Sequence, residues 1–186
     1  MIKFYYNIFV IIKLILLYLV AYVQTIEVII DNDETSMVNF AKIVTMYSNF
    51  EYDEIKLIFN ENYYKIANEG KNRFNVKSDL IFYSEKGTIF DFQDDDRSNL
   101  SFFFQPDYTN KTITFYNISF INYYSEYVKS SSLIYFIFPK NSDHYIEFNN
   151  CIFRNLRSLL FNFEHSCVNS VQTSIPQVSI INCKIM

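Results

Sequence analysis

The residues best suited to chemistry are few, and the densest set is the acidic run Asp94-Asp95-Asp96. A glycosidase needs two carboxyl groups that face each other across a bond, and adjacent residues of one loop cannot be opposed in this way. Calcium prefers six or more oxygen ligands, and nothing else nearby in the sequence completes such a set. We therefore interpret the run as a solvated loop, with a weak calcium site as the alternative.

Two histidines, His144 and His165, are the only candidates for a general base of the imidazole type. They fall at unrelated positions of the repeat described below, and no serine or cysteine stands with them in a recognisable triad order. Both are predicted to lie on surface loops. The sequence thus predicts no catalytic residue, no metal site and no cofactor, and the chain is not expected to be an enzyme.

The three cysteines, Cys151, Cys167 and Cys183, are spaced 16 residues apart. Cys151 and Cys183 share one position of the repeat, so they should stack at the strand spacing of about 4.8 Å. That distance permits a disulfide, but stacked side chains point the same way and the bond would be strained. An unpaired stack is favoured, and a disulfide formed in an oxidising compartment is the alternative.

A repeat organises the second half of the chain. Similar segments begin at Leu80, Ile113, Ile146 and Val178, at intervals of 33, 33 and 32 residues. Such a period indicates stacked repeats, and by length alone it would also suit ankyrin or tetratricopeptide helix pairs. Apolar Ile113 and Phe115 alternate with Thr114 and Tyr116, however, which is the pattern of a strand.

Leucine-rich repeats also end a short strand with asparagine, but there the asparagine follows the last strand leucine by three residues. Here Asn150 follows Phe148 by two. A second strand completes each unit, because Ser101–Pro106 aligns with Ile134–Pro139 at an offset of 33, and a third version occupies Leu159–Phe163. The pattern predicts an all-β fold, a single-stranded right-handed parallel β-helix, with the leucine-rich repeat as the weaker alternative.

Stacking in this register would form columns of side chains along the axis. The interior columns would be Ile113/Ile146/Val178, Phe115/Phe148/Ile180 and Phe120/Phe153/Ile185. Asn117, Asn150 and Asn182 would form an asparagine ladder at the bend after the strand, because asparagine tolerates the left-handed backbone and stacked amides can bond along the axis. The two stacked cysteines, Cys151 and Cys183, belong to the same structural ladder.

Residues 1–25 resemble a secretory signal peptide, with Lys3 near the start and a ten-residue apolar run from Leu14 to Val23. A membrane anchor is the alternative, although Lys13 interrupts the longer stretch that a span requires. Residues 26–186 would then form one β-helix domain, with a helix over about 33–48 covering its N-terminal end. Strands are predicted at Thr25–Ile30, Ile55–Phe59, Tyr63–Ile66 and Phe74–Tyr83.

This order of elements resembles the opening of pectin-lyase-like parallel β-helices, through Ile-Lys-Leu-Ile-Phe (55–59), Tyr-Tyr-Lys-Ile (63–66) and Asp-Leu-Ile-Phe-Tyr-Ser-Glu-Lys-Gly-Thr-Ile-Phe-Asp (79–91). The Asn-Cys-x-Phe-x-Asn segment also resembles the Phe-x-x-Asn repeats of polymorphic outer-membrane proteins. One departure is Asn60-Glu61-Asn62-Tyr63, where the family usually has Pro-Gly-Thr-Tyr. The resemblance implies the N-terminal part of a β-helix, whose family includes carbohydrate-active enzymes.

Charge and modification motifs agree with an extracellular protein. The net charge is −4, and removal of residues 1–25, which hold two lysines and no acid, would make it −6. Such a domain is a poor partner for nucleic acid. Asn99 and Asn110 head sequons in predicted loops and are candidate glycosylation sites. We expect a secreted or cell-surface module with a structural, adhesive or glycan-binding role. Its partner would be a carbohydrate or another surface protein. The alternative is a fragment of a pectin-lyase-like carbohydrate-active enzyme.

The last repeat predicts self-association. Its strand would leave backbone groups unpaired beside Ile180 and Ile185, and such an edge is a template for pairing with another chain. The chain is therefore expected either to belong to a longer protein or to associate end to end.

Overall fold

Strands dominate the computed structural model, which describes residues 24–50, 52–66, 72–95, 97–124, 132–139, 143–165 and 178–186. Residues 1–23, with nearly all of the predicted signal peptide, and Cys167 lie outside this part. The elements in chain order are β1 (Thr25–Ile29), α2 (Glu34–Ser48), β2 (Glu54–Ile58), β3 (Tyr63–Lys65), β4 (Arg73–Val76), β5 (Asp79–Asp91), β6 (Leu100–Phe104), β7 (Thr112–Tyr124), β8 (Ser132–Phe138), β9 (Tyr145–Asn149), β10 (Ile152–Arg157), β11 (Leu159–His165), β12 (Val178–Ile181) and β13 (Lys184–Ile185).

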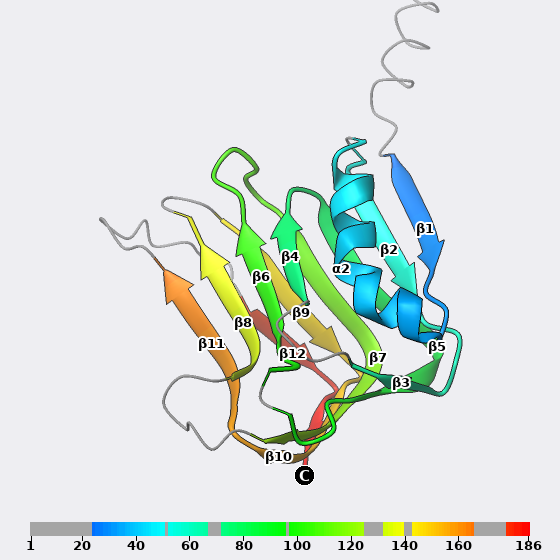
Figure 1. Cartoon of the computed structure of the whole chain (residues 1–186). Coiled ribbons are helices and arrows are strands. Elements are labelled where there is room, and N and C mark those ends of the chain that lie inside the picture. The colour runs from blue at the N-terminus through cyan, green and yellow to red at the C-terminus, as the bar shows by residue number, and fades with distance from the viewer. Residues whose placement is uncertain are drawn as a thin grey trace, which may run out of the picture.

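The strands form a parallel β-helix with three faces (Figure 1). Sheet A contains nine strands and bends, because the long strands β5 and β7 each contribute to two of its faces. Face 1 consists of β1, β2, the first halves of β5 and β7, β9 and β12, and face 2 consists of β3, the second halves of β5 and β7, β10 and β13. Face 3 is sheet B, in the order β11-β8-β6-β4. Every strand pair is parallel, and four complete turns result.

The register of face 1 matches the repeat spacing. Leu80 pairs with Ile113, Ile113 with Ile146, and Ile146 with Val178. Earlier turns step by fewer residues, since Thr25 pairs with Glu54 and Glu54 with Asp79. The 33-residue period is therefore a property of the later turns.

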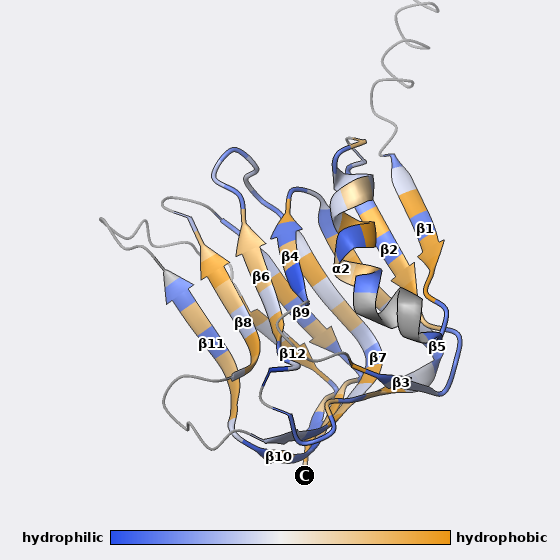
Figure 2. Ribbon diagram, in the orientation of Figure 1, coloured by the Kyte–Doolittle hydropathy of each residue, from blue (hydrophilic) through white to orange (hydrophobic). Residues whose placement is uncertain are grey.

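The interior is built from columns of stacked aromatic rings. On face 1, the ring of Phe115 lies 4.8 Å from that of Phe82 and 5.0 Å from that of Phe148. On face 3, Phe102 lies 4.7 Å from Phe74 and 5.5 Å from Phe136. Buried and half-buried residues alternate along strands such as β2 and β9, and Figure 2 shows alternating hydrophobic and hydrophilic residues as orange and blue bands. Packed phenylalanines each remove a large apolar area from water, so the columns supply much of the driving force for stacking the turns.

The predicted alignment of the second strand was wrong by one residue. Ser101 pairs with Tyr135 rather than Ile134, which places Phe102 opposite Phe136. A one-residue slip would exchange inward and outward side chains. The observed register keeps the buried rings in one column and leaves Phe103 on the outside.

The run Phe74–Tyr83, predicted as one strand, is divided between two sheets. Phe74 belongs to β4 on face 3, and Tyr83 belongs to β5 on face 1. The chain bends at Lys77-Ser78, where the Ser78 hydroxyl donates to the Tyr52 carbonyl of the preceding turn. Buried positions continue to alternate through this bend, but Ser78 replaces an apolar residue there, so the polar run Lys77-Ser78-Asp79 was the sign of the corner.

The one helix of the described residues, α2, continues the layer of sheet B beyond β4 (Figure 1). It packs against β4 and β2, and the ring of Phe40 meets that of Phe74 edge-on at 5.2 Å. The helix thus takes the face 3 position in the first turn. Over the described part of the chain, no helix is both long and apolar enough to cross a membrane.

Candidate binding surface

The outward side chains of face 1 form a continuous row across five strands. Lys56 Nζ on β2 lies 2.6 Å from Glu27 Oε1 on β1 and 4.7 Å from the ring centre of Tyr83 on β5. Tyr83 stacks on Tyr116 of β7, with ring centres 5.2 Å apart and an interplanar angle of 17°. Asn149 pairs in register with Tyr116 across the β7–β9 ladder. We call these residues, with Glu147 of β9, the outer row.

The pleat of the strands places these side chains together. Residues at alternate positions of a strand share one face, and the opposed pairs Glu27/Lys56 and Tyr83/Tyr116 stand about 5 Å apart. Lys56 and Tyr83 are diagonal neighbours, because Lys56 is paired with Ile81. Asn149 Nδ2 donates to Glu147 Oε1 at 3.3 Å, which joins the last two members. Five strands at about 4.8 Å give the row a length of about 19 Å.

The side chains of the outer row are suited to binding an uncharged ligand that carries many hydroxyl groups. Glu27 compensates the charge of Lys56, and Glu147 adds a second carboxylate, so the row is slightly acidic. Its members offer ring surface, phenol hydroxyls, carboxylate acceptors and an amide donor. An anionic ligand would meet net negative charge here.

A second row of polar contacts runs along the axis at the bend after face 2. Asn155 Nδ2 donates to Asn122 Oδ1 at 2.7 Å, and Asn122 Nδ2 donates to Asp91 Oδ1 at 3.1 Å. The Tyr63 hydroxyl donates to Asp91 Oδ2 at 2.8 Å. Partial burial, followed by the hydrogen bond to the Asp91 carboxylate and its charge, raises the pKa of Tyr63. These four side chains link four successive turns.

The predicted ladder residues have the backbone conformation that a sharp bend requires. Asn117, Asn150 and Asn182 have φ of 59°, 54° and 52°. The Asn117 amide donates to the carbonyl groups of Ser84 and Glu85 at 3.2 and 3.1 Å, so this side chain fastens one turn to the previous one. Bonding between the amides of Asn150 and Asn182 stays a prediction.

The sequence reasoning missed Asn122 and Asn155, which have φ of 56° and 55° and bond to each other. They too are separated by 33 residues, so the period contained the signal for a second asparagine corner.

Cys151 and Cys183 are free thiols in the structure, one turn apart. The backbone N–H of Cys151 donates to Cys183 Sγ at 3.3 Å. Burial raises the pKa of the Cys151 thiol to about 12, which suppresses its thiolate form and makes it a poor nucleophile. This pair is better suited to packing than to chemistry.

The acidic run does not assemble a metal site among the described residues. Asp95 Oδ1 accepts hydrogen bonds from the backbone N–H and Nε of Arg97 at 2.9 and 3.4 Å, which closes a local turn. Asp94 is exposed with φ of 56°, and Asp96 lies outside the described part. Throughout that part, no three His, Cys, Asp or Glu side chains are grouped to hold a metal ion.

His144 contradicts the prediction that it lies on the surface. Its side chain is fully buried, 4.2 Å from the ring of Phe104, and Nδ1 accepts the backbone N–H of Lys111 at 3.1 Å. The other histidine, His165, is the last residue of β11 rather than part of a loop. The candidate glycosylation residues differ in exposure, since Asn110 is exposed and Asn99 is half-buried beside the start of β6.

No protein-family model, no curated protein and no solved structure matches this chain. The geometry of its own residues is therefore the basis for a functional proposal.

Proposed function

We propose that this chain is a secreted or cell-surface β-helix module that binds a neutral glycan along the outer row of face 1. The observation that carries this proposal is the contact series from Glu27 through Lys56 and Tyr83 to Tyr116. An array about 19 Å long suits a chain of sugars better than a single one, because five strands present polar and aromatic side chains along one direction.

The charge of the row argues for a neutral ligand over an acidic one. Glu27 and Glu147 outnumber Lys56, and the whole chain carries −4. Polyuronates would be repelled, and repulsion between like charges weakens binding. This point disfavours the alternative function, a fragment of a pectin-lyase-like carbohydrate-active enzyme.

The remaining parts of the proposal come from the sequence. A signal peptide over residues 1–25 would deliver the module outside the cell, and Asn99 and Asn110 would then be available for glycosylation. A right-handed path is proposed because nearly all parallel crossovers take that hand. Helix α2 would cap the N-terminal end of face 3 only, a role that its contacts with β4 and β2 support, and would leave the outer edge of β1 uncovered.

Binding to immobilised glycans tests the proposal. Purified full-length chain should bind one or more neutral polysaccharides, such as β-glucan or mannan, more tightly than polygalacturonate. Tyr83→Ala and Tyr116→Ala should each weaken binding at least tenfold. Tyr135→Ala is the matched control, since Tyr135 also points outward but lies on face 3, where its hydroxyl contacts Glu164.

Two results would overturn the proposal. One is the absence of neutral-glycan binding, and the other is binding that Tyr83→Ala and Tyr116→Ala leave unchanged. Release of reducing ends from polygalacturonate or β-glucan by the pure protein would instead support the enzyme alternative.

A further inference from the structure

The two ends of the β-helix present complementary edges of sheet A. Among the strands of the described residues, β1 pairs only with β2 at one end, and at the other end β12 pairs only with β9 and β13 only with β10. All of these strands run parallel. An edge strand exposes a row of unpaired N–H and C=O groups. The free edge of β12 can therefore pair with the free edge of β1 from another copy in the same parallel sense.

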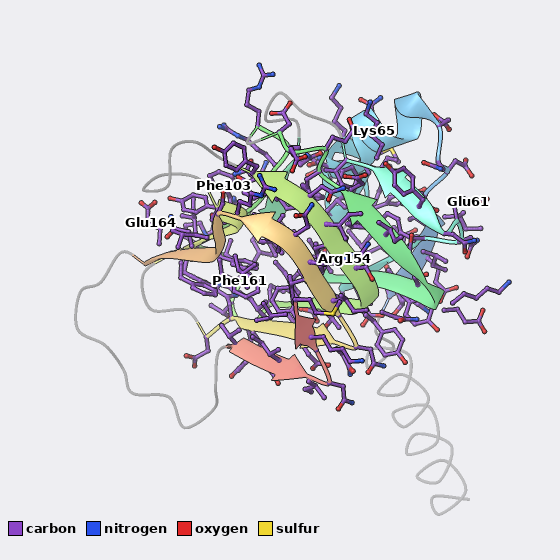
Figure 3. The ribbon with its side chains drawn as sticks, turned by 90° about the horizontal axis from the view of Figure 1, so that it is seen from below. Glu61, Lys65, Phe103, Arg154, Phe161 and Glu164 are labelled. Carbon is purple, nitrogen blue, oxygen red and sulfur yellow. The ribbon has the colours of Figure 1, made fainter. Side chains whose placement is uncertain are left out.

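At the β12 end, the last apolar side chains of the interior columns are exposed to solvent. Ile180 continues the column of Phe148 and is 52% exposed, and Ile185 continues the column of Phe153 and is 68% exposed. Phe148 and Phe153, one turn inside, are buried. In Figure 3, which shows the molecule from below, β12 lies at the outer margin of the ribbon and the short strand β13 lies between it and β10. A further layer of apolar side chains would remove these residues from water.

The β1 end offers that layer in the same alternation. Ile26 and Val28 are half-buried and face inward above Ile55 and Leu57, whereas Ile29 faces outward and is 60% exposed. Continuing the columns across a junction sets one register, in which Val178, Ser179, Ile180 and Ile181 oppose Ile26, Glu27, Val28 and Ile29 of the next copy. This register keeps inward residues opposite inward residues. It also brings Ile181, 39% exposed, against Ile29.

Face 3 fits the same junction in size. Sheet B ends with β11, one turn before sheet A ends with β12 and β13, and it begins with β4, one turn after β1. Head-to-tail stacking would leave two strand positions between β11 of one copy and β4 of the next, about 10 Å of width. A helix is about 10 Å across. Helix α2 of the next copy, which already lies against β4, would therefore fill this gap.

Charge adds to the complementarity on face 2. Lys184 of β13 is exposed at the C-terminal edge. Asp31 is exposed at the N-terminal edge, next to Ile30, whose carbonyl accepts the Tyr64 hydroxyl at 3.0 Å beside β3. The junction would bring these opposite charges to the same face, which favours this orientation of the two copies.

We propose that the occupant of both edges is a second copy of this chain, joined head to tail by a β12–β1 parallel pairing in which Ile181 opposes Ile29. The contact is heterologous, because two different surfaces meet, and repetition of one such contact builds a filament or a ring rather than only a dimer. This assembly goes beyond glycan binding and does not depend on it. It would also repeat the outer row of face 1 from copy to copy, which raises the avidity for a polymeric ligand.

Sedimentation velocity of the full-length chain tests this inference, with charge placed at the two opposed positions. Wild-type protein should form species larger than the monomer, and the fraction of protein in these species should rise with concentration. The double variant Ile29→Lys with Ile181→Lys places like charges opposite each other across the junction and should be monomeric. The double variant Ile29→Glu with Ile181→Lys places opposite charges across the junction and should associate, as the wild type does.

Thr114→Lys is the control, because Thr114 faces outward on β7, which is paired on both sides by β5 and β9, and this variant should associate like wild type. Circular dichroism of each variant checks that the fold is kept, and residues 1–23, which are the same in every variant, cannot account for a difference between them. Three results would each overturn the proposal: a wild-type monomer at every concentration, lysine substitution at both positions without effect, or failure of the oppositely charged pair to associate.

Discussion

The buried imidazole of His144 predicts a defined loss of stability in acid. Nδ1 accepts the Lys111 N–H, and Nε2 is buried without a hydrogen-bond partner among the described residues. The rings of Phe104 and Phe138 lie 4.2 and 6.1 Å away. Burial lowers the pKa of His144 from 6.5 to about 4, while the charge of Asp143 opposes this effect and that of Lys111 adds to it.

The sign follows from proton linkage. The unfolded chain takes up a proton near its ordinary pKa of 6.5, whereas the folded chain resists until about pH 4. The contribution of neutral His144 is therefore complete above pH 6.5, falls as the pH drops from 6.5 to 4, and is absent below. The gap of about 2.5 pKa units corresponds to about 3 kcal/mol. That is a large share of the stability of a typical domain, about 5–15 kcal/mol.

Urea unfolding followed by circular dichroism from pH 4 to 7.5 measures this effect. Carboxylates also titrate in this range, so the quantity to compare is the difference in unfolding free energy between wild type and His144→Gln. Glutamine keeps an oxygen that can accept the Lys111 N–H but has no imidazole to titrate. The unfolding free energy of wild type, relative to that of the variant, should fall by about 3 kcal/mol from pH 7 to pH 4. A His165→Gln background leaves one imidazole for direct titration by NMR.

Two outcomes contradict this reasoning. The first is a difference between wild type and variant that stays constant across the pH range. The second is an NMR titration of His144 near pH 6.5, which would mean that the ring is solvated in the folded protein.

Three further predictions concern the core, the corners and modification. Phe115→Ala, in the middle of a ring column, should cost about 3–5 kcal/mol in urea unfolding, and Phe163→Ala, 43% exposed, less than half of that. Asn150→Leu should lower the unfolding free energy by about 1–2 kcal/mol, because leucine strains a left-handed corner. Asn149→Leu should be near neutral, and equal changes in thermal midpoint for the two variants would contradict the corner assignment. When the protein is expressed in a secretory eukaryotic host, mass spectrometry should find a glycan on exposed Asn110. The variant Asn110→Gln should lack this glycan and keep the same melting temperature. An unmodified Asn110 in secreted protein would refute the prediction.

The sequence was informative where a repeat carries its own register. In face 1, Ile113 and Ile146 are β-branched, alternate with polar residues and recur at a fixed spacing, so their pairing was visible. In face 3, the run Phe102-Phe103-Phe104 has no alternation, and a slip of one residue leaves the pattern unchanged. The side that each ring faces is decided by contacts with neighbouring turns, which a single strand does not encode.

The candidate surface was harder to predict for a related reason. Lys56 and Glu27 belong to early turns that step by 29 and 25 residues, outside the 33-residue period. The approach of Lys56 to both Glu27 and Tyr83 depends on how these irregular turns stack. His144 was misjudged because polar residues are usually exposed, and only the fold shows the rings that enclose it.

The corner between the two halves of β5 shows where this architecture can accept change. Tyr83 pairs with Tyr116 and Thr88 with Ile118, so the chain inserts extra residues at the bend while the pairing on both sides continues. Gly87, with φ of 88°, lies under Asn117, whose amide closes the inserted segment. Added length at a surface bend costs little loop entropy and disturbs no ladder. Corners of this kind are therefore the sites at which such a protein can diversify in evolution, and at which an epitope or reporter peptide can be introduced without loss of the stacked core.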